Sequence, residues 1–121
     1  MARNLPVVSV PVDTSALTFL AAGTPAPKIK NRKTGELKTD ASGRTLYDVP
    51  ALMRSAQARQ GEPVTLVVPD EPQGVDMGVP LAVSGLVAYV WGFEDDEHRL
   101  RYGVSWRAAN VIPATAAAVT R

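Results

Sequence analysis

The chain has 121 residues, enough for one domain but too few for two of ordinary size. Hydrophobic residues make up 45% of it and charged residues 21%, so it can bury a core, which excludes an intrinsically disordered protein. It has no cysteine, which excludes disulfides and thiolate chemistry, and no uninterrupted apolar run of about 20 residues that would span a membrane. We expect a soluble, cytoplasmic protein.

The net charge of +1 hides a segregation of charge along the chain. Residues 1–69 carry nine Lys and Arg against five Asp and Glu, residues 70–98 carry none against seven, and residues 99–121 carry four against none. Charges that are separated along the sequence can become separated on the folded surface, which is typical of proteins that bind a charged partner.

Ten prolines and nine glycines divide the chain into short, valine-rich pieces, a pattern that favours β-strands. Strands are expected, in chain order, at residues 5–12, 18–22, 28–33, 45–49, 63–68, 81–93 and 99–106. The polar stretch 34–44 between the third and the fourth contains two glycines and predicts a long, mobile hairpin.

The segment 50–60 supports two interpretations. Asp48 as N-cap, Pro50 in the first turn and Gly61 after the end favour a short helix. Alternatively, the strand that begins at residue 45 continues through Leu52, and Pro50 then needs an edge or bulge position. We adopt the strand.

Of these pieces, about five are expected to be the principal strands of an antiparallel sheet. The strand 81–93 is long enough to bend and belong to both edges of that sheet. The five strands are most economically closed as a five-stranded Greek-key barrel of OB type, because closure removes exposed strand edges. The predicted fold is therefore all-β with a long basic hairpin, and a β-sandwich or another barrel is the alternative. Residues 1–113 form the domain, and residues 114–121 are expected to be a flexible tail.

The side chains that catalysis needs are missing. His98 is the only histidine and adjoins four consecutive acids, residues 94–97, in an expected turn. No nucleophile elbow, phosphate-binding glycine loop or zinc-protease motif is present. The acidic cluster lacks the spacing of a calcium loop and is interpreted as a solvated turn. We expect no enzyme, no cofactor and no metal.

The first functional signal is the basic hairpin. Its six cations stand against two carboxylates, and they are Lys28, Lys30, Arg32, Lys33, Lys38 and Arg44. Phosphates attract such a segment, because each neutralised phosphate releases condensed counterions whatever the base sequence. The equal alternative is a hairpin charged only for solubility.

The second signal is the alternation of rings and cations in residues 87–93 and 99–107. A five-residue turn over 94–98 would place Phe93 opposite Arg99 and Trp91 opposite Arg101. Because side chains alternate faces, one face would hold Tyr89, Trp91, Phe93, Arg99, Arg101, Ser105 and Arg107. The other, turned to the core, would hold Leu86, Ala88, Val90, Leu100, Tyr102, Val104 and Trp106.

Rings beside guanidinium groups suit single-stranded nucleic acid, since rings stack on bases and cations hold the backbone. A turn of another length, or a bulge, would reverse the faces and bury Tyr89 and Trp91 in the core. Tyr47, at the foot of the basic hairpin, is a further stacking candidate, with a buried barrel tyrosine as its equal alternative.

Three segments, PVTLVV, VPLAVSGLVAYVWG and RAANVIPA, follow a basic hairpin that ends in GRTLYDV. In this arrangement the chain resembles the filamentous-phage gene-five type of single-stranded DNA-binding protein, an OB-fold family, over about 90 residues. It is also similar to small proteins of plasmids and integrating elements of high-GC bacteria.

The resemblance implies that wing residues bind the DNA backbone, that Tyr47 stacks on a base, and that residues 91–93 contact DNA or a dimer mate. The wing residues meant are Lys30, Arg32, Lys33, Lys38 and Arg44. The acidic residues 94–97 depart from the family's pattern, which makes a subunit contact more plausible than a DNA contact at that tip.

The sequence thus predicts a non-enzymatic, sequence-tolerant single-stranded DNA-binding protein of a mobile element, acting in replication or transfer as a homodimer, with RNA binding left open. Its expected contacts are Lys28, Lys30, Arg32, Lys33, Lys38, Arg44, Tyr47, Trp91, Phe93, Arg99 and Arg101. The alternative is a structural or protein-interaction β-barrel that docks a basic partner through the acidic segment 70–97.

Overall fold

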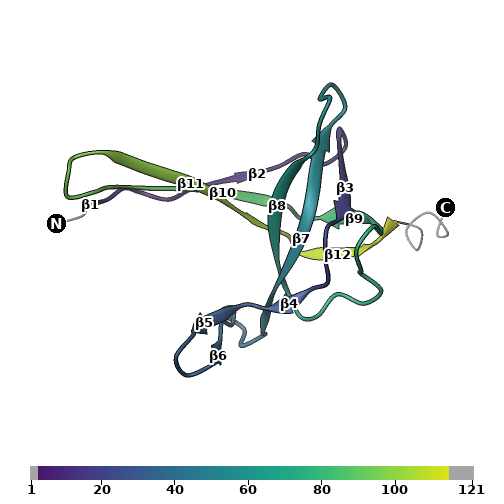
Figure 1. The fold of residues 1–121 in the computed structure, drawn as a ribbon, viewed down its shortest axis with the longest axis horizontal. Helices are drawn as coiled ribbons and strands as arrows, with labels where there is room; N and C mark the ends of the chain where they lie inside the picture. Colours follow the sequence, from purple (N-terminus) through teal and green to yellow (C-terminus); the bar gives the residue numbers. More distant parts are fainter. Residues whose placement is uncertain (1–2, 115–121) are drawn as a thin grey trace.

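The computed structural model describes residues 3–114 and confirms an all-β protein (Figure 1). The strands are β1 (Arg3–Asn4), β2 (Val8–Pro11), β3 (Leu17–Ala21), β4 (Ala26–Pro27), β5 (Ile29–Asn31), β6 (Glu36–Leu37), β7 (Leu46–Ser55), β8 (Glu62–Pro69), β9 (Pro80–Ser84), β10 (Val87–Glu94), β11 (Leu100–Arg107) and β12 (Asn110–Pro113). The described residues contain no helix long and apolar enough to cross a lipid bilayer. The predicted tail lies almost wholly in residues 115–121, outside the described part.

Ten strands form one strongly curled sheet, a half-barrel, in the order β1-β10-β11-β8-β7-β3-β9-β12, with β2 beside β10 and β4 beside β7. The remaining two, β5 and β6, form a separate hairpin. β8 and β11 pair in parallel, whereas the other pairs are antiparallel. The sheet therefore joins segments that are distant in sequence.

The expected long strand 81–93 is interrupted. It consists of β9, which pairs with β3 and β12, and β10, which pairs with β11 and β2. The break falls at Gly85, which has a φ of 63°. A Cβ there would lie 2.6 Å from the Cβ of Ala109, so only glycine fits this turn. The strand thus bends between two parts of the sheet, as expected, but by breaking.

The ambiguous segment after Asp48 is a strand, because β7 continues to Ser55. Pro50 lies where β7 changes its neighbour on one side from β3 to β4. On that same side the carbonyl of Pro50 accepts a hydrogen bond from the Ala22 N–H, at 2.9 Å. Pro50 therefore lies opposite Ala22 and lacks the N–H that would return this hydrogen bond, so the ladder between β3 and β7 ends where β7 changes its neighbour.

The core lies inside the curl of the sheet. Leu66, Val49 and Val111 are its largest fully buried side chains, and they come from β8, β7 and β12. β12 was not expected from the sequence, although it closes the core over β9. Burial of these apolar residues is the main force that holds the curled sheet together.

Two hairpins project from this half-barrel (Figure 1). We call residues 28–44, which include β5 and β6, the wing. We call β10 and β11, together with β1 and β2 alongside β10, the arm. Both begin at the same part of the sheet, since the wing leads into β7 and the arm joins β8, the neighbour of β7.

Candidate nucleic-acid interface

The arm has the faces that the sequence predicts, in a different register. Trp91 pairs with Gly103 and Phe93 with Arg101, so the predicted pairings of Trp91 with Arg101 and Phe93 with Arg99 are wrong by two residues. The tip occupies residues 95–99 instead of 94–98, because Glu94 pairs with Leu100. Since side chains alternate with a period of two, a shift of two residues leaves every side chain on the face predicted for it.

The ring-bearing face of the arm, which we call the outer face, is ordered by contacts between its own side chains. The Trp91 and Phe93 rings are stacked, with centroids 6.4 Å apart and planes 8° from parallel. The Arg107 guanidinium lies over the Tyr89 ring, 4.9 Å from its centroid. Trp91 keeps 37% of its surface exposed. The outer face therefore presents a row of partly accessible rings beside a cation.

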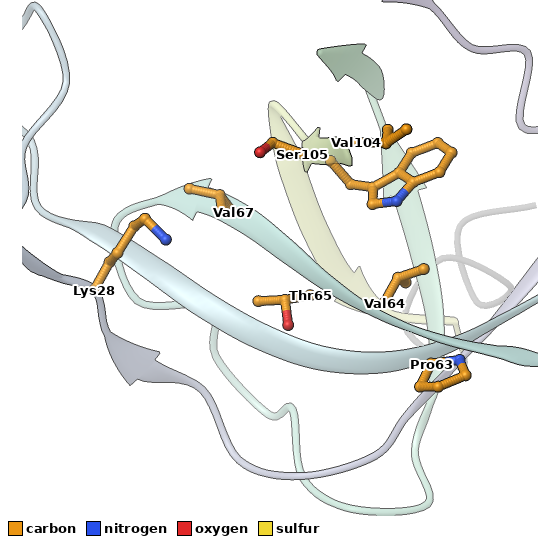
Figure 2. A pocket seen from close by; sticks show the side chains of 8 residues that line it. Lys28, Pro63, Val64, Thr65, Val67, Val104 and Ser105 are labelled. Carbon is orange, nitrogen blue, oxygen red and sulfur yellow. The ribbon is translucent and has the colours of Figure 1, made fainter. Parts of the chain in front are cut away.

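A cleft of about 280 Å³ opens at the base of the arm (Figure 2). It forms because β8 and β11 pair only at Leu66 with Trp106 and at Val67 with Arg107, and then diverge. Its lining consists of Lys28, Pro63, Val64, Thr65, Val67, Val104, Ser105 and Trp106. The lining thus contains one cation, two hydroxyl groups and no carboxylate, a composition that accepts a polar or anionic group.

The wing brings three of its six cations into ion pairs. Lys28 Nζ lies 3.4 Å from Asp48, Lys30 Nζ lies 3.8 Å from Glu36, and Arg44 Nε lies 3.0 Å from Asp40. The other three, within the described chain, make no ion pair, and they are Arg32, Lys33 and Lys38. Arg32 and Lys33 are exposed and Lys38 is half-buried, and all three charges remain available for phosphates.

The cations nearest the arm's tip are partly neutralised. The Asp95 carboxylate accepts hydrogen bonds from the Nε atoms of Arg99 and Arg101, at 3.1 and 3.2 Å, and from the backbone N–H groups of Glu97 and Arg99. The backbone bond from Arg99 is the main cause that lowers the pKa of Asp95. Arg99 and Arg101 were expected to contact nucleic acid, which stays a prediction, and in the structure both side chains bond to this carboxylate.

The turn at residues 40–44 of the wing has the same arrangement of hydrogen bonds as the arm tip. Asp40 accepts the backbone N–H groups of Ser42 and Arg44 and the Arg44 Nε, and the backbone bond from Arg44 is the main cause that lowers the pKa of Asp40. Both turns have Asp and Arg four residues apart. This spacing is visible in the sequence and could have identified the two turns, but our sequence reasoning missed it.

Tyr47 lies away from the outer face. It is half-buried and packs against the core, on the same side of β7 as Val49. Asp48, the next residue, points outward to Lys28. The structure thus places the ring of Tyr47 in the alternative position considered for it, a barrel tyrosine.

The opposite face of the arm turns to the core only near the half-barrel. Ala88 is buried and Trp106 packs against the core, as expected. Farther out, Leu100, Tyr102 and Val104 are 60%, 74% and 44% exposed, so the expectation that they face the core is wrong. The reason is that the outer part of the arm projects beyond the half-barrel, where no other described element covers this face (Figure 1).

The acidic segment divides between two places. Asp70, Glu71 and Asp76 lie in the loop between β8 and β9, at the end of β8 away from the arm (Figure 1). Residues 94–97 form the arm tip. Neither group lines the cleft at the base of the arm. Among the described residues no group of three or more histidine or acidic side chains could hold a metal ion.

Sequence reasoning missed Thr65 altogether and did not count Tyr89, Ser105 and Arg107 among the contacts. The last three were visible from the alternation of the arm. Thr65 carried no signal, because it joins the site only through the parallel pairing of β8 with β11.

Comparison of the chain with models of protein families, with curated proteins and with solved structures finds no match.

Proposed function

We propose that this protein binds single-stranded nucleic acid without sequence preference, with single-stranded DNA as its ligand. We also propose that it is not an enzyme. One observation carries the proposal, the row of rings on the outer face, in which Trp91 stacks with Phe93 and Tyr89 lies under Arg107. Unstacked bases need such rings, and each base stacked on an aromatic side chain contributes about 1–3 kcal/mol.

The position of the cations supports the same function. Lys28 stands at the cleft beside the outer face, and the wing that begins at Lys28 adds Arg32, Lys33 and Lys38. A backbone that follows the cleft from the rings toward the wing would meet cations along its path. Cations and ring faces distinguish poorly between bases, which is why sequence tolerance is proposed.

We assign the half-barrel to the OB class within this proposal. The order β3, β7, β8, β11 and β10, with β9 returning to β3 and β8 parallel to β11, supports a five-stranded Greek key in which β9 and β10 act as one bent strand. A role in the replication or transfer of a mobile element follows from the resemblance to the gene-five type of protein.

Binding is tested by fluorescence anisotropy of labelled oligo(dT) at several salt concentrations. The triple variant Arg32→Ala, Lys33→Ala, Lys38→Ala should weaken binding and reduce the slope of log K against log salt by about 2, since each lost phosphate contact contributes about 0.7 for single strands. The matched control is Arg59→Ala, an exposed cation in the turn between β7 and β8, at the far end of these strands from the wing. It should leave the slope unchanged.

Duplex DNA and RNA of the same length serve as competitors. Oligo(dT) should compete better than duplex DNA, because the rings need unstacked bases. Absence of oligo(dT) binding at low salt would contradict the proposal and favour the alternative of a protein-docking barrel.

A further inference from the structure

Arg107 differs from the other arginines of the arm in what its guanidinium group contacts. Arg99 and Arg101 bond to the Asp95 carboxylate, whereas the Arg107 guanidinium makes no ion pair or hydrogen bond within the described chain. It lies instead over the Tyr89 ring, with its central carbon 4.9 Å from the ring centroid. All its N–H donors therefore remain available to a ligand.

The neighbours of Tyr89 leave this pair of side chains uncovered. Tyr89 lies opposite Ser105 on β11 and opposite Ser9 on β2, and both of these side chains are short. Tyr89 is half-buried and Arg107 is exposed. A ligand that approaches this face of the ring therefore meets the guanidinium before it meets the ring.

A guanidinium group can carry a base in the same way as an aromatic ring. It is planar, its charge is delocalised and it is more weakly hydrated than an ammonium group, so unstacked bases pack on its plane. Cation–π attraction to the ring beneath keeps the plane in place before a base arrives. Less side-chain freedom is then lost on binding, which favours affinity.

The cleft at the base of the arm lies next to this pair. Ser105 lines the cleft on the same face of β11 as Arg107, and Val67 lines it as the ladder partner of Arg107. Lys28 and Thr65 belong to the same lining, which contains no carboxylate (Figure 2). A nucleotide whose base lies on Arg107 would therefore find an ammonium group and hydroxyl groups beside it for its phosphate.

We propose that Arg107 is a stacking platform, on whose guanidinium plane one base of the bound strand lies, and that Tyr89 is the positioning residue that holds this plane. The inference rests on the proposed function, because it assigns one subsite of the same surface. At this end of the ring row the base contacts a cation and not the tyrosine ring. Arginine is needed here for its shape, so lysine, with equal charge but no plane, cannot replace it.

The substitution Arg107→Lys separates shape from charge. In anisotropy measurements with labelled oligo(dT), it should raise the dissociation constant about tenfold, as expected for the loss of one stacked base. The slope of log K against log salt should stay unchanged, because the charge is kept. Arg59→Lys, at an exposed arginine in the turn between β7 and β8, is the matched control and should change neither quantity.

An abasic oligonucleotide of the same length provides the second measurement. It keeps the phosphates and lacks the bases, so the wild-type protein and Arg107→Lys should bind it with equal affinity. If Arg107 only supported the fold, the substitution would weaken binding of both oligonucleotides by the same factor. That result would overturn the proposal.

Variants of Tyr89 test its positioning role. Tyr89→Phe keeps the ring and should bind oligo(dT) as the wild type does. Tyr89→Leu should weaken binding, and its combination with Arg107→Lys should weaken binding little further, because the two side chains act as a unit. If amide spectra show that Tyr89→Leu alters the fold, Arg107→Lys and the abasic strand decide the question.

The outcomes distinguish this inference from the function on which it rests. A wild-type protein that does not bind oligo(dT) would overturn both. Unchanged affinity in Arg107→Lys would overturn the stacking role of Arg107 and leave the proposed function intact. If Tyr89→Leu alone weakened binding, the base would lie on the tyrosine ring itself.

Discussion

The packing of the Trp91 indole against Gly103 gives the sharpest prediction about the outer face. The two residues are direct cross-strand partners, and the indole covers the glycine as aromatic residues often do opposite a strand glycine. A Cβ built on Gly103 would lie 2.8 Å from Cε2 and 2.9 Å from Cη2 of Trp91, and closer still to Cζ2. Gly103→Ala should therefore displace the indole and break its stack with Phe93.

The magnitude follows from two opposing effects. Crowding a packed position costs about 1–3 kcal/mol, and loss of the aromatic pair lies within that range. Replacing glycine by alanine in a strand returns about 0.4–1 kcal/mol, because the unfolded chain loses conformational freedom. The variant should be destabilised by about 1 kcal/mol. Gly61→Ala is the matched control, since a Cβ there would meet Leu52 at an ordinary 3.4 Å.

Three measurements check this prediction. Tryptophan emission should shift to longer wavelength, urea unfolding should show the loss of stability, and the affinity for oligo(dT) should fall because the ring row is broken. The Gly61→Ala protein should show none of these changes. Unaltered emission and stability in Gly103→Ala would refute the description of this contact.

Other predictions concern the turns and the core. His98 has a φ of 62°, in the left-handed region that strains a residue with a Cβ, and the corresponding position of the wing turn is Gly43. His98→Gly should therefore stabilise the protein by about 1 kcal/mol in urea unfolding. A loss of stability would contradict the claim that the His98 backbone is strained. The pKa values of Asp40 and Asp95 are lowered from 3.8, so the stability that their charged forms give is complete above pH 3.8 and is lost as the pH falls through the lowered pKa values. NMR titration of the two carboxyl groups should give both midpoints below pH 3.8. A midpoint at or above pH 3.8 would contradict the hydrogen bonds that these carboxylates accept in the turns. Leu66→Ala, at a fully buried residue, should cost about 2–5 kcal/mol in urea unfolding, and a cost under about 1 kcal/mol would contradict the packing.

Local patterns in the sequence predicted the strands and the faces of the arm. Alternation survives an error in register, which is why Trp91 and Phe93 fell on the correct face although their pairing partners were wrong by two residues. The continuation of β7 through Pro50 was also predictable, because the residues around it alternate as a strand does.

What the sequence could not predict depends on contacts between distant segments. The cleft requires the parallel pairing of β8 and β11, and the break at Gly85 requires the approach of Ala109. Alternation also shows which residues share a face but not what covers that face. Tyr102 was therefore expected in the core, although it stands on an arm that extends beyond the core.

The central claim is that single-stranded DNA lies across the outer face and reaches the wing. Backbone amide shifts of the labelled protein, recorded during titration with oligo(dT), test it most directly. The account predicts saturable shifts at Tyr89, Trp91, Lys28 and Lys33, with little change at Leu20. Shifts concentrated in the acidic loop after β8, or spread evenly without saturation, would contradict it.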